Sequence, residues 1–409
     1  MNAPELLCPA GDRESLRAAL HFGADAVYGG MKRYGLRASA GNFDGEELAD
    51  AVRDAHEAGA RFYVTMNVYP FDDEMDGFMS AAREARDAGA DAVIVSDPGA
   101  IRRLRREIPD LPVHVSTQAS TVNSEAAEMY RDMGCERIIL AREMSLERIR
   151  KMKDKLGDSI ALETFVHGAS CMAYSGRCLL SAYLTGRSGN RGECAQPCRW
   201  QYAVVEEKRP GEYIPVEEDE RGTYLFSARD LCLMPILPDL CDAGVSSLKI
   251  EGRMKTEYYV AVVTGAYRRA LDLLADSREA FDQALPELMD ELKSASHRDS
   301  DTGFLLGKPE KPGGAEGFHQ EKEYIARVIS RDGQTGQARL LLKNRFFAGE
   351  TLELMTASGI RRVTARPFLR EKTGEITDTL GVAGEIIRME LPECGAGDLL
   401  RGTVRNHRR

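Results

Sequence analysis

Residues 81–95, AAREARDAGADAVIV, carry the pattern that decides the fold. A stretch rich in Ala, Arg and Glu ends at Ala88-Gly89, and the short apolar run 92–95 follows. A glycine in that place suits the left-handed cap at the end of a helix, and the apolar run is long enough for a buried parallel strand. The stretch therefore predicts one helix-to-strand step.

The same step recurs around Gly23, Gly59, Gly134 and Gly244, and three further apolar runs bring the number of predicted strands to eight. Eight parallel strands that alternate with helices are typical of a closed, TIM-like (β/α)8 barrel. An open doubly wound sheet is the alternative, but no Gly-x-Gly-x-x-Gly loop follows any of these strands. The predicted strands are 5–8, 26–28, 62–64, 92–95, 113–116, 137–140, 160–166 and 247–250.

The interval between the seventh and eighth strands is far longer than the other intervals and holds a cysteine-rich insertion, about residues 167–241. It follows the carboxyl end of a strand, which is the face where barrels of this type place their active sites. Within it, residues 204–223 are predicted to form an exposed hairpin or loop, and residues 227–241 a helix that returns to the eighth strand.

The domain organisation that follows is a barrel over residues 1–296, a polar linker over 297–320 and a small all-β barrel over 321–409. Residues 256–295 are expected to be helical, and alternating apolar residues beyond the linker predict antiparallel strands. Small β-barrels of this kind bind nucleic acid or serve as docking modules, and the sequence leaves both readings open.

The net charge of −10 argues against a protein that coats nucleic acid with its whole surface. Residues 321–409, however, hold 16 Lys and Arg against 12 Asp and Glu, so this part could meet phosphates. No apolar run approaches the length of a membrane span, and the first residues lack the features of a secretory signal. We therefore expect a cytoplasmic protein.

Five cysteines of the insertion are candidate metal ligands. Clustered cysteines in a cytosolic chain favour metal binding over disulfides, and thiolates hold either zinc or an iron–sulfur cluster. The spacing lacks the paired Cys-x2-Cys of a zinc ribbon, which favours the iron–sulfur cluster over structural zinc or reduced buried thiols. The candidate ligands are Cys171, Cys178, Cys194 and Cys198, with Cys232 as an alternative fourth ligand.

Polar residues at predicted strand ends are candidates for catalysis and substrate binding. His167 stands at the end of the seventh strand and suits acid–base work, although it could equally fix the loop by hydrogen bonding. Glu163, Glu251 and Arg253 are further catalytic candidates. The usual hydrolase signals, a second zincin histidine, a Gly-x-Ser-x-Gly elbow and a phosphate-binding Gly-x-x-x-x-Gly-Lys loop, are missing.

Several short stretches together carry a family resemblance: residues 5–12 (ELLCPAGD), 23–28 (GADAVY), 165–169 (FVHGA), 175–178 (SGRC) and 249–253 (KIEGR). They resemble the collagenase-like peptidases of family U32, from residue 4 to about residue 310. The C-terminal region is similar, more weakly, to the domain that this family appends to its barrel.

The resemblance implies an RNA-modifying enzyme with a 4Fe-4S cluster rather than a peptidase. Family members of this type hydroxylate the wobble uridine of tRNA at carbon 5 with prephenate as the oxygen source, and others hydroxylate a cytidine of 23S rRNA or a quinone precursor. Cys171, Cys178 and Cys194 match the cluster ligands in every version of the family pattern, and Cys198 or Cys232 is the fourth. The implied partner is the tRNA anticodon loop.

Prephenate is a dicarboxylate, and carboxylates are bound best by arginine. The candidates for substrate binding are Arg37, Asn67, Arg142 and Arg199, together with Arg253. A U32-type peptidase remains the alternative, in which His167 and Glu163 would activate water.

Overall fold

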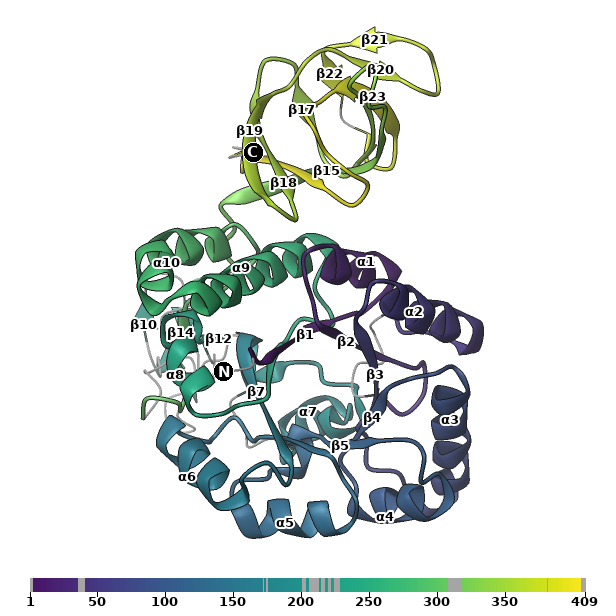
Figure 1. The fold of residues 1–409 in the computed structure, drawn as a ribbon, viewed down its shortest axis with the longest axis vertical. Helices are drawn as coiled ribbons and strands as arrows, with labels where there is room; N and C mark the ends of the chain where they lie inside the picture. The colour runs from purple at the N-terminus through teal and green to yellow at the C-terminus, as the bar shows by residue number, and fades with distance from the viewer. Residues whose placement is uncertain are drawn as a thin grey trace.

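The computed structural model describes residues 3–35, 41–171, 173, 176–200, 204–205, 213–214, 218–219, 222–223, 229–307, 318–380 and 382–405. Eight parallel strands form a closed barrel, in which β13 pairs with both β1 and β7. Figure 1 shows this barrel inside a ring of helices, and the predicted TIM-like (β/α)8 fold is confirmed. Its strands are β1 (Glu5–Pro9), β2 (Ala26–Gly30), β3 (Arg61–Met66), β4 (Ala92–Val95), β5 (Val113–Val115), β6 (Arg137–Ile139), β7 (Ala161–Ala169) and β13 (Ser247–Ile250).

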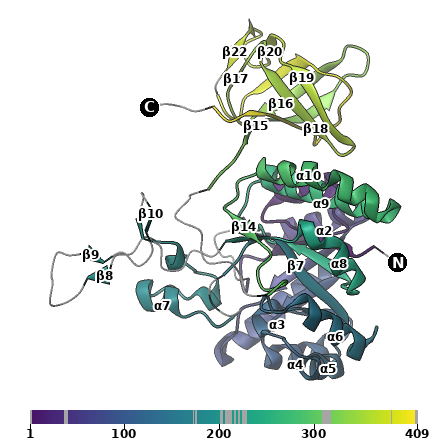
Figure 2. The same ribbon diagram turned by 90° about the vertical axis from the view of Figure 1, so that its left-hand side faces the viewer.

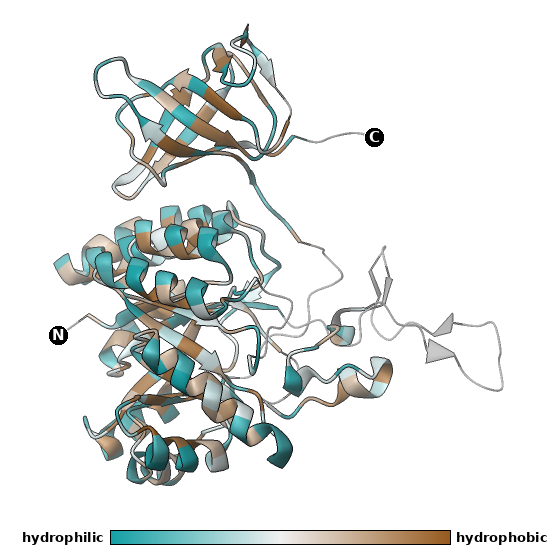
Figure 3. Cartoon of the chain, turned by 90° about the vertical axis from the view of Figure 1, so that its right-hand side faces the viewer, coloured by the Kyte–Doolittle hydropathy of each residue, from teal (hydrophilic) through white to brown (hydrophobic). Residues whose placement is uncertain are grey.

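Helices cover the barrel from outside. In Figure 3 the outer surfaces of these helices are largely hydrophilic, whereas the strands that they surround are largely apolar. The five glycines between helix and strand all have positive φ, from 75° to 95°, as the sequence pattern requires. The helical stretch expected over 256–295 is two helices that meet at the extended residue Ser277. The helices are α1 (Arg13–His21), α2 (Gly45–Glu57), α3 (Met75–Asp87), α4 (Pro98–Glu107), α5 (Ser124–Asp132), α6 (Leu146–Leu156), α8 (Leu237–Asp242), α9 (Glu257–Asp276) and α10 (Arg278–Lys293).

The cysteine-rich insertion leaves the barrel at the carboxyl end of β7, and Figure 2 shows α7 on the side away from the N-terminus. The hairpin expected over 204–223 corresponds to two short antiparallel pairs, β8 with β9 and β10 with β11. The elements of the insertion up to that point are α7 (Leu180–Thr185), η3 (Gly189–Arg191), η4 (Pro197–Arg199), β8 (Val204–Val205), β9 (Tyr213–Ile214), β10 (Glu218–Asp219) and β11 (Gly222–Thr223).

The return of the insertion differs from the expected helix over 227–241. Instead β12 (Asp230–Cys232) is extended, and it pairs antiparallel with the last residues of β7. Asp230 is held there by Arg298, whose Nη2 lies 2.5 Å from Oδ1. These contacts come from distant parts of the chain and outweigh local helix preference, so that helix α8 begins only after the short turn η5 (Met234–Ile236). Residues 227 and 228 lie outside the described residues.

The C-terminal region is an antiparallel all-β unit with its own core, as predicted. Before it, β14 (Ser300–Asp301), in the expected linker, pairs with β12 and adds to the barrel sheet. No helix in the described part of the chain has the length and apolar character needed to cross a membrane. The C-terminal strands are β15 (Lys322–Arg331), β16 (Gln337–Leu342), β17 (Phe346–Phe347), β18 (Thr351–Thr356), β19 (Gly359–Thr364), β20 (Phe368–Arg370), β21 (Ile376–Thr377), β22 (Thr379–Leu380), β23 (Ile386–Glu390) and β24 (Leu399–Thr403).

An ion-pair cluster joins this unit to the outer helices of the barrel, next to α9, α10 and α1 in Figure 1. The buried carboxylate of Glu257 lies 2.8 Å from both Arg327 and Lys343. The hydroxyl of Tyr324 also donates to it at 2.8 Å, while the Tyr324 ring stacks on Tyr258. Because two cations share one buried carboxylate, Glu257 is the centre of the contact between the two units.

We predict that Glu257→Gln lowers the free energy of unfolding by about 2 kcal/mol, because it removes the buried carboxylate that Arg327 and Lys343 share and leaves them only the exposed carboxylate of Glu14. Urea unfolding followed by circular dichroism measures this. Glu287→Gln is the matched control, since Glu287 pairs with Arg269 at an exposed position and is expected to cost less than about 0.5 kcal/mol. Equal losses in the two variants would contradict the assigned role of Glu257.

Candidate active site at the barrel mouth

The carboxyl ends of the eight parallel strands, called here the barrel mouth, collect most of the polar candidates. The cysteine-rich insertion lies against this end. A Cβ atom added at Gly176 would come within 2.2 Å of the carbonyl oxygen of Gln118, so only glycine allows the approach. Near Tyr69, whose hydroxyl donates to the same Gln118 carbonyl, Arg191 pairs with Glu74 at 2.5 Å and lies over the ring of Phe71. The insertion is thus anchored on the mouth at two places.

Arg142 and Glu251 form a polar pair over the ends of β6, β7 and β13. Nη1 of Arg142 donates to the carbonyl oxygen of Ala169 at 2.5 Å, and Nη2 lies 3.5 Å from a carboxylate oxygen of Glu251. The guanidinium also lies 4.1 Å from the centre of the Phe165 ring. The two side chains are 18% and 15% exposed, so both can reach a ligand in the mouth while the protein holds their orientation.

Arg253 plays a more internal part than Arg142. Its guanidinium donates to Oγ1 of Thr65 at 2.5 Å and to the side-chain oxygen of Asn42 at 2.6 Å, and it is 4% exposed. A Cβ atom at Gly30 would lie 2.4 Å from this guanidinium. Arg253 therefore links the end of β13 to the end of β3 and to the segment that follows β2 by hydrogen bonds, beneath the surface of the barrel mouth.

His167 lies in β7, opposite Cys232 of β12 and beside the rings of Tyr259 and Tyr267. Burial lowers the pKa of His167 to about 4, although Asp230 acts in the opposite direction. The imidazole is therefore neutral at neutral pH. Its Nδ1 is buried and has no hydrogen-bond partner among the described residues, which leaves one nitrogen able to hold or move a proton.

Glu163 lies away from the mouth, inside the barrel, and is completely buried. Its two carboxylate oxygens are each 3.0 Å from a cation, Arg137 on one side and Lys249 on the other. Arg137 also lies 2.6 Å from Glu5, which begins β1. Burial lowers the pKa of Lys249 against the opposing effect of Glu163. The structure thus places Glu163 in an internal ion network and not next to His167.

The remaining substrate-binding candidates divide between described and undescribed positions. Asn67 follows β3 at the mouth, where its carbonyl oxygen accepts a hydrogen bond from Ser96 at 2.9 Å. Arg37 and the side chain of Arg199 lie outside the described residues. The mouth therefore brings together Arg142, Glu251 and Asn67, with Arg253 beneath.

The five cysteines fit an iron–sulfur cluster in their chemistry. None of the five forms a disulfide within the described part of the chain, and Cys171, Cys178, Cys194 and Cys198 are exposed or half-exposed on the insertion, whereas Cys232 is buried. Burial raises the pKa of the Cys232 thiol, which opposes the thiolate form that metals bind. In the described part of the chain, no three cysteine, histidine or carboxylate groups lie close enough together to hold a metal ion.

Three further residues were not singled out from the sequence: Lys249 pairs with Glu163 inside the barrel, and Tyr130 and Arg177 line a cavity at the mouth. The role of Lys249 could not be predicted, because the apolar pattern of a strand does not indicate a buried ion network. Tyr130 lies on α5, away from any strand end. Arg177 could have been noticed, because it directly precedes Cys178 and is the only charged residue between Cys171 and Cys178.

The sequence matches models of a known protein family and resembles several curated proteins. Residues 11–314 match the profile of peptidase family U32, and residues 320–401 match that of the U32 C-terminal domain. The tRNA hydroxylation protein P1 of Bacillus subtilis (strain 168) is 39% identical over 353 residues, which cover 86% of this chain and 83% of that protein. The tRNA hydroxylation protein P of Escherichia coli (strain K12) is 37% identical over 407 residues, which cover 88% and 87%. A 23S rRNA 5-hydroxycytidine synthase of the same E. coli strain is 39% identical over 274 residues, covering 67% of this chain and 40% of that protein.

We predict that His167 makes the protein sensitive to acid. The folded state binds this proton only near pH 4 and the unfolded state near pH 6.5, so the unfolded state gains protons first as the pH falls between these values. Stability is therefore lost from pH 6.5 to pH 4, by about 3 kcal/mol from this residue.

His167→Gln should remove most of that loss, as measured by urea unfolding at a series of pH values. His56→Gln is the control, because His56 is exposed and pairs with Asp91 at the surface, and it should keep the pH dependence of the unchanged protein. An unaltered pH dependence in His167→Gln would show that this imidazole is not held neutral by burial.

Proposed function

Because the chain belongs to peptidase family U32, and because tRNA hydroxylation proteins resemble it over both its domains, we propose that it hydroxylates a base of RNA. The observation that carries the proposal is this similarity over nearly the full length, which includes the barrel, the insertion and the C-terminal unit. The finer form of the proposal is 5-hydroxylation of the wobble uridine of tRNA with prephenate as the oxygen source.

The pair Arg142 and Glu251 suits a pyrimidine base that has been turned out of its stack. A guanidinium donates to base carbonyl oxygens, and a carboxylate accepts from a ring N–H, so the pair can bind the polar edge of uracil. Phe165, beneath the guanidinium, supplies an apolar surface. Single-stranded loops present such unstacked bases, which agrees with the anticodon loop as the partner.

The cofactor of the proposed enzyme is a 4Fe-4S cluster, held by Cys171, Cys178, Cys194 and either Cys198 or Cys232. Such a cluster supplies one-electron transfer when bound. Conversion of C5–H to C5–OH with oxygen at the level of hydroxide, RH + H2O → ROH + 2 H+ + 2 e−, is a two-electron oxidation of the base, and the two electrons pass one at a time to a one-electron carrier. Within the described part of the mouth, the buried Nδ1 of His167, which has no hydrogen-bond partner there, is the group that we assign to proton transfer.

The peptidase alternative gains no support from the positions of its two residues. Glu163 is paired with Arg137 and Lys249 inside the barrel, and His167 packs against tyrosines. A carboxylate that activates water must reach that water by a hydrogen bond. Among the described residues, His167 and Glu163 do not form such a pair.

We predict that this chain restores tRNA hydroxylation in Escherichia coli cells that lack their own tRNA hydroxylation proteins. Mass spectrometry of nucleosides from purified tRNA should detect uridines that carry an oxygen atom at carbon 5. The 5-hydroxycytidine of 23S rRNA, measured in cells that lack the corresponding synthase, distinguishes the ribosomal alternative. If neither RNA gains the modification while the protein is present and folded, the proposed function is wrong.

A second prediction concerns the metal. Protein purified without oxygen is expected to contain about four iron and four sulfide per chain, since each thiolate of a 4Fe-4S cluster binds one iron. Cys171→Ala, Cys178→Ala and Cys194→Ala should each lose the iron, and one of Cys198→Ala and Cys232→Ala should do the same. Cys241→Ala is the control and should keep it. Stoichiometric zinc without iron would contradict the redox cofactor.

A further inference from the structure

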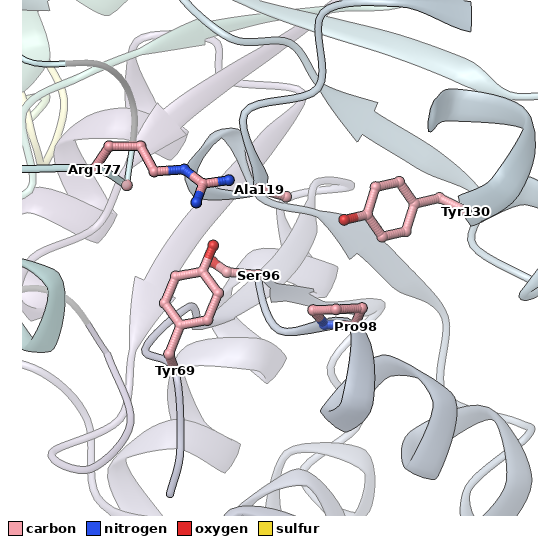
Figure 4. A pocket seen from close by; sticks show the side chains of 7 residues that line it. Tyr69, Ser96, Pro98, Ala119, Tyr130 and Arg177 are labelled. Carbon is pink, nitrogen blue, oxygen red and sulfur yellow. The ribbon is translucent and has the colours of Figure 1, made fainter. Parts of the chain in front are cut away.

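A cavity of about 350 Å³ opens at the barrel mouth beside the ends of β4 and β5. Its wall includes the first residue of α4, Pro98, and its other side is bounded by Gly176 and the exposed Arg177 of the insertion. Figure 4 shows the guanidinium of Arg177 and the hydroxyl groups of Tyr69 and Tyr130 pointing into the same space. The cavity is therefore built jointly by the barrel and by the cysteine-rich segment.

Arg177 differs from the other described arginines of the mouth. Arg142 pairs with Glu251, Arg191 pairs with Glu74, and Arg253 is held by Thr65 and Asn42. Arg177, in contrast, makes no hydrogen bond or ion pair with any described residue. A guanidinium aimed into a cavity without a counter-ion is a position ready for an anion.

Asp97 is an acidic group close enough to the cavity for its charge, in addition to burial, to raise the pKa of Tyr69 and Tyr130. It caps α4, where its Oδ1 accepts the backbone N–H of Ala100 at 2.7 Å, and among the described residues it forms no ion pair with Arg177. The same helix directs the positive end of its dipole toward the cavity wall at Pro98, which adds to the preference for an anion.

Tyr130 supplies a buried donor. Its side chain is 7% exposed, lines the cavity, and has no hydrogen-bond partner for its hydroxyl among the described residues. Burial raises the pKa of Tyr130 and of Tyr69, so both hydroxyls stay protonated at neutral pH. Tyr69 already donates to the carbonyl oxygen of Gln118 at 2.7 Å, which leaves Tyr130 as the free donor.

We propose that this cavity binds the carboxylate group of a small organic acid, with Arg177 donating to the carboxylate oxygens and the Tyr130 hydroxyl donating to one of them. Pro98 and Ala119 provide an apolar wall for the body of the molecule. The volume lies at the small end of ligand sites, which suits a compact acid rather than a nucleotide. This inference rests on the proposed function, in which such an acid supplies the oxygen.

The position of the site agrees with that role. Arg177 directly precedes Cys178, one of the proposed cluster ligands, and Gly176 lies on Gln118 at the end of β5. A carboxylate bound to Arg177 of the insertion and to Tyr130 of the barrel would therefore connect the two parts of the structure. Arg177 acts in this account as a substrate-binding residue and Tyr130 as its partner.

Isothermal titration of prephenate into the full chain, purified without oxygen, tests the inference. Arg177→Gln should weaken binding at least about tenfold, and Tyr130→Phe about threefold to tenfold, because each removes a hydrogen bond to a charged group. Arg187→Gln is the matched control, since Arg187 is an exposed arginine of the same insertion that does not line the cavity. It should bind prephenate as the unchanged protein does.

Binding by Arg177→Gln equal to that of the unchanged protein would overturn the inference, as would the absence of prephenate binding. The inference would also fail if Arg177→Gln lost affinity for tRNA alone, since the anion would then be an RNA phosphate. Nucleoside analysis of tRNA distinguishes a failure of this binding site from a failure of the proposed function. Hydroxylation without Arg177-dependent binding refutes only the site, and Arg177-dependent binding without hydroxylation refutes only the proposed function.

Discussion

The pairing of β13 with β7 is the constraint on which the rest of the structure depends. These two strands close the barrel although the whole insertion separates them in the chain. The insertion leaves at the carboxyl end of β7, and its last strand, β12, returns to that same end before α8 leads to the start of β13. The short strand β12 strengthens this arrangement, since it lies along the end of β7 and places Cys232 opposite His167. The position of the candidate site thus follows from barrel closure.

Charged groups in this protein have two different uses. Inside the barrel, Glu163 is shared by Arg137 and Lys249, so a buried charge has its counter-ions within 3.0 Å. At the mouth, Arg142 and Glu251 lie 3.5 Å apart and are 18% and 15% exposed, while Arg142 also donates to the carbonyl oxygen of Ala169. A fully buried ion pair serves stability, whereas a partly exposed pair that the protein holds in place can also contact a ligand. This contrast separates structural from functional charges in the same barrel.

The sequence predicted the strands of the barrel well because a short apolar run marks each of them and a capping glycine precedes five of the eight, as at Gly89 and residues 92–95. It failed at β12, where the extended backbone depends on Arg298, which is distant in the chain. It also could not distinguish Glu163, inside the barrel, from Glu251, at the mouth, because both lie on or next to a strand. The roles of Tyr130 and Arg177 depend on a cavity that forms only when the insertion packs on the barrel.

The central claim is that an RNA base is hydroxylated at the barrel mouth, with its polar edge bound by the pair Arg142 and Glu251. The most direct test is the content of 5-oxygenated uridine in tRNA from cells that express only the Glu251→Gln variant. This variant keeps the size of the side chain and removes its charge. The account predicts that the modified nucleoside falls at least about tenfold while the amount of folded protein is unchanged, as expected when a hydrogen bond to a charged group is lost. Modification at the level of the unchanged protein would contradict it.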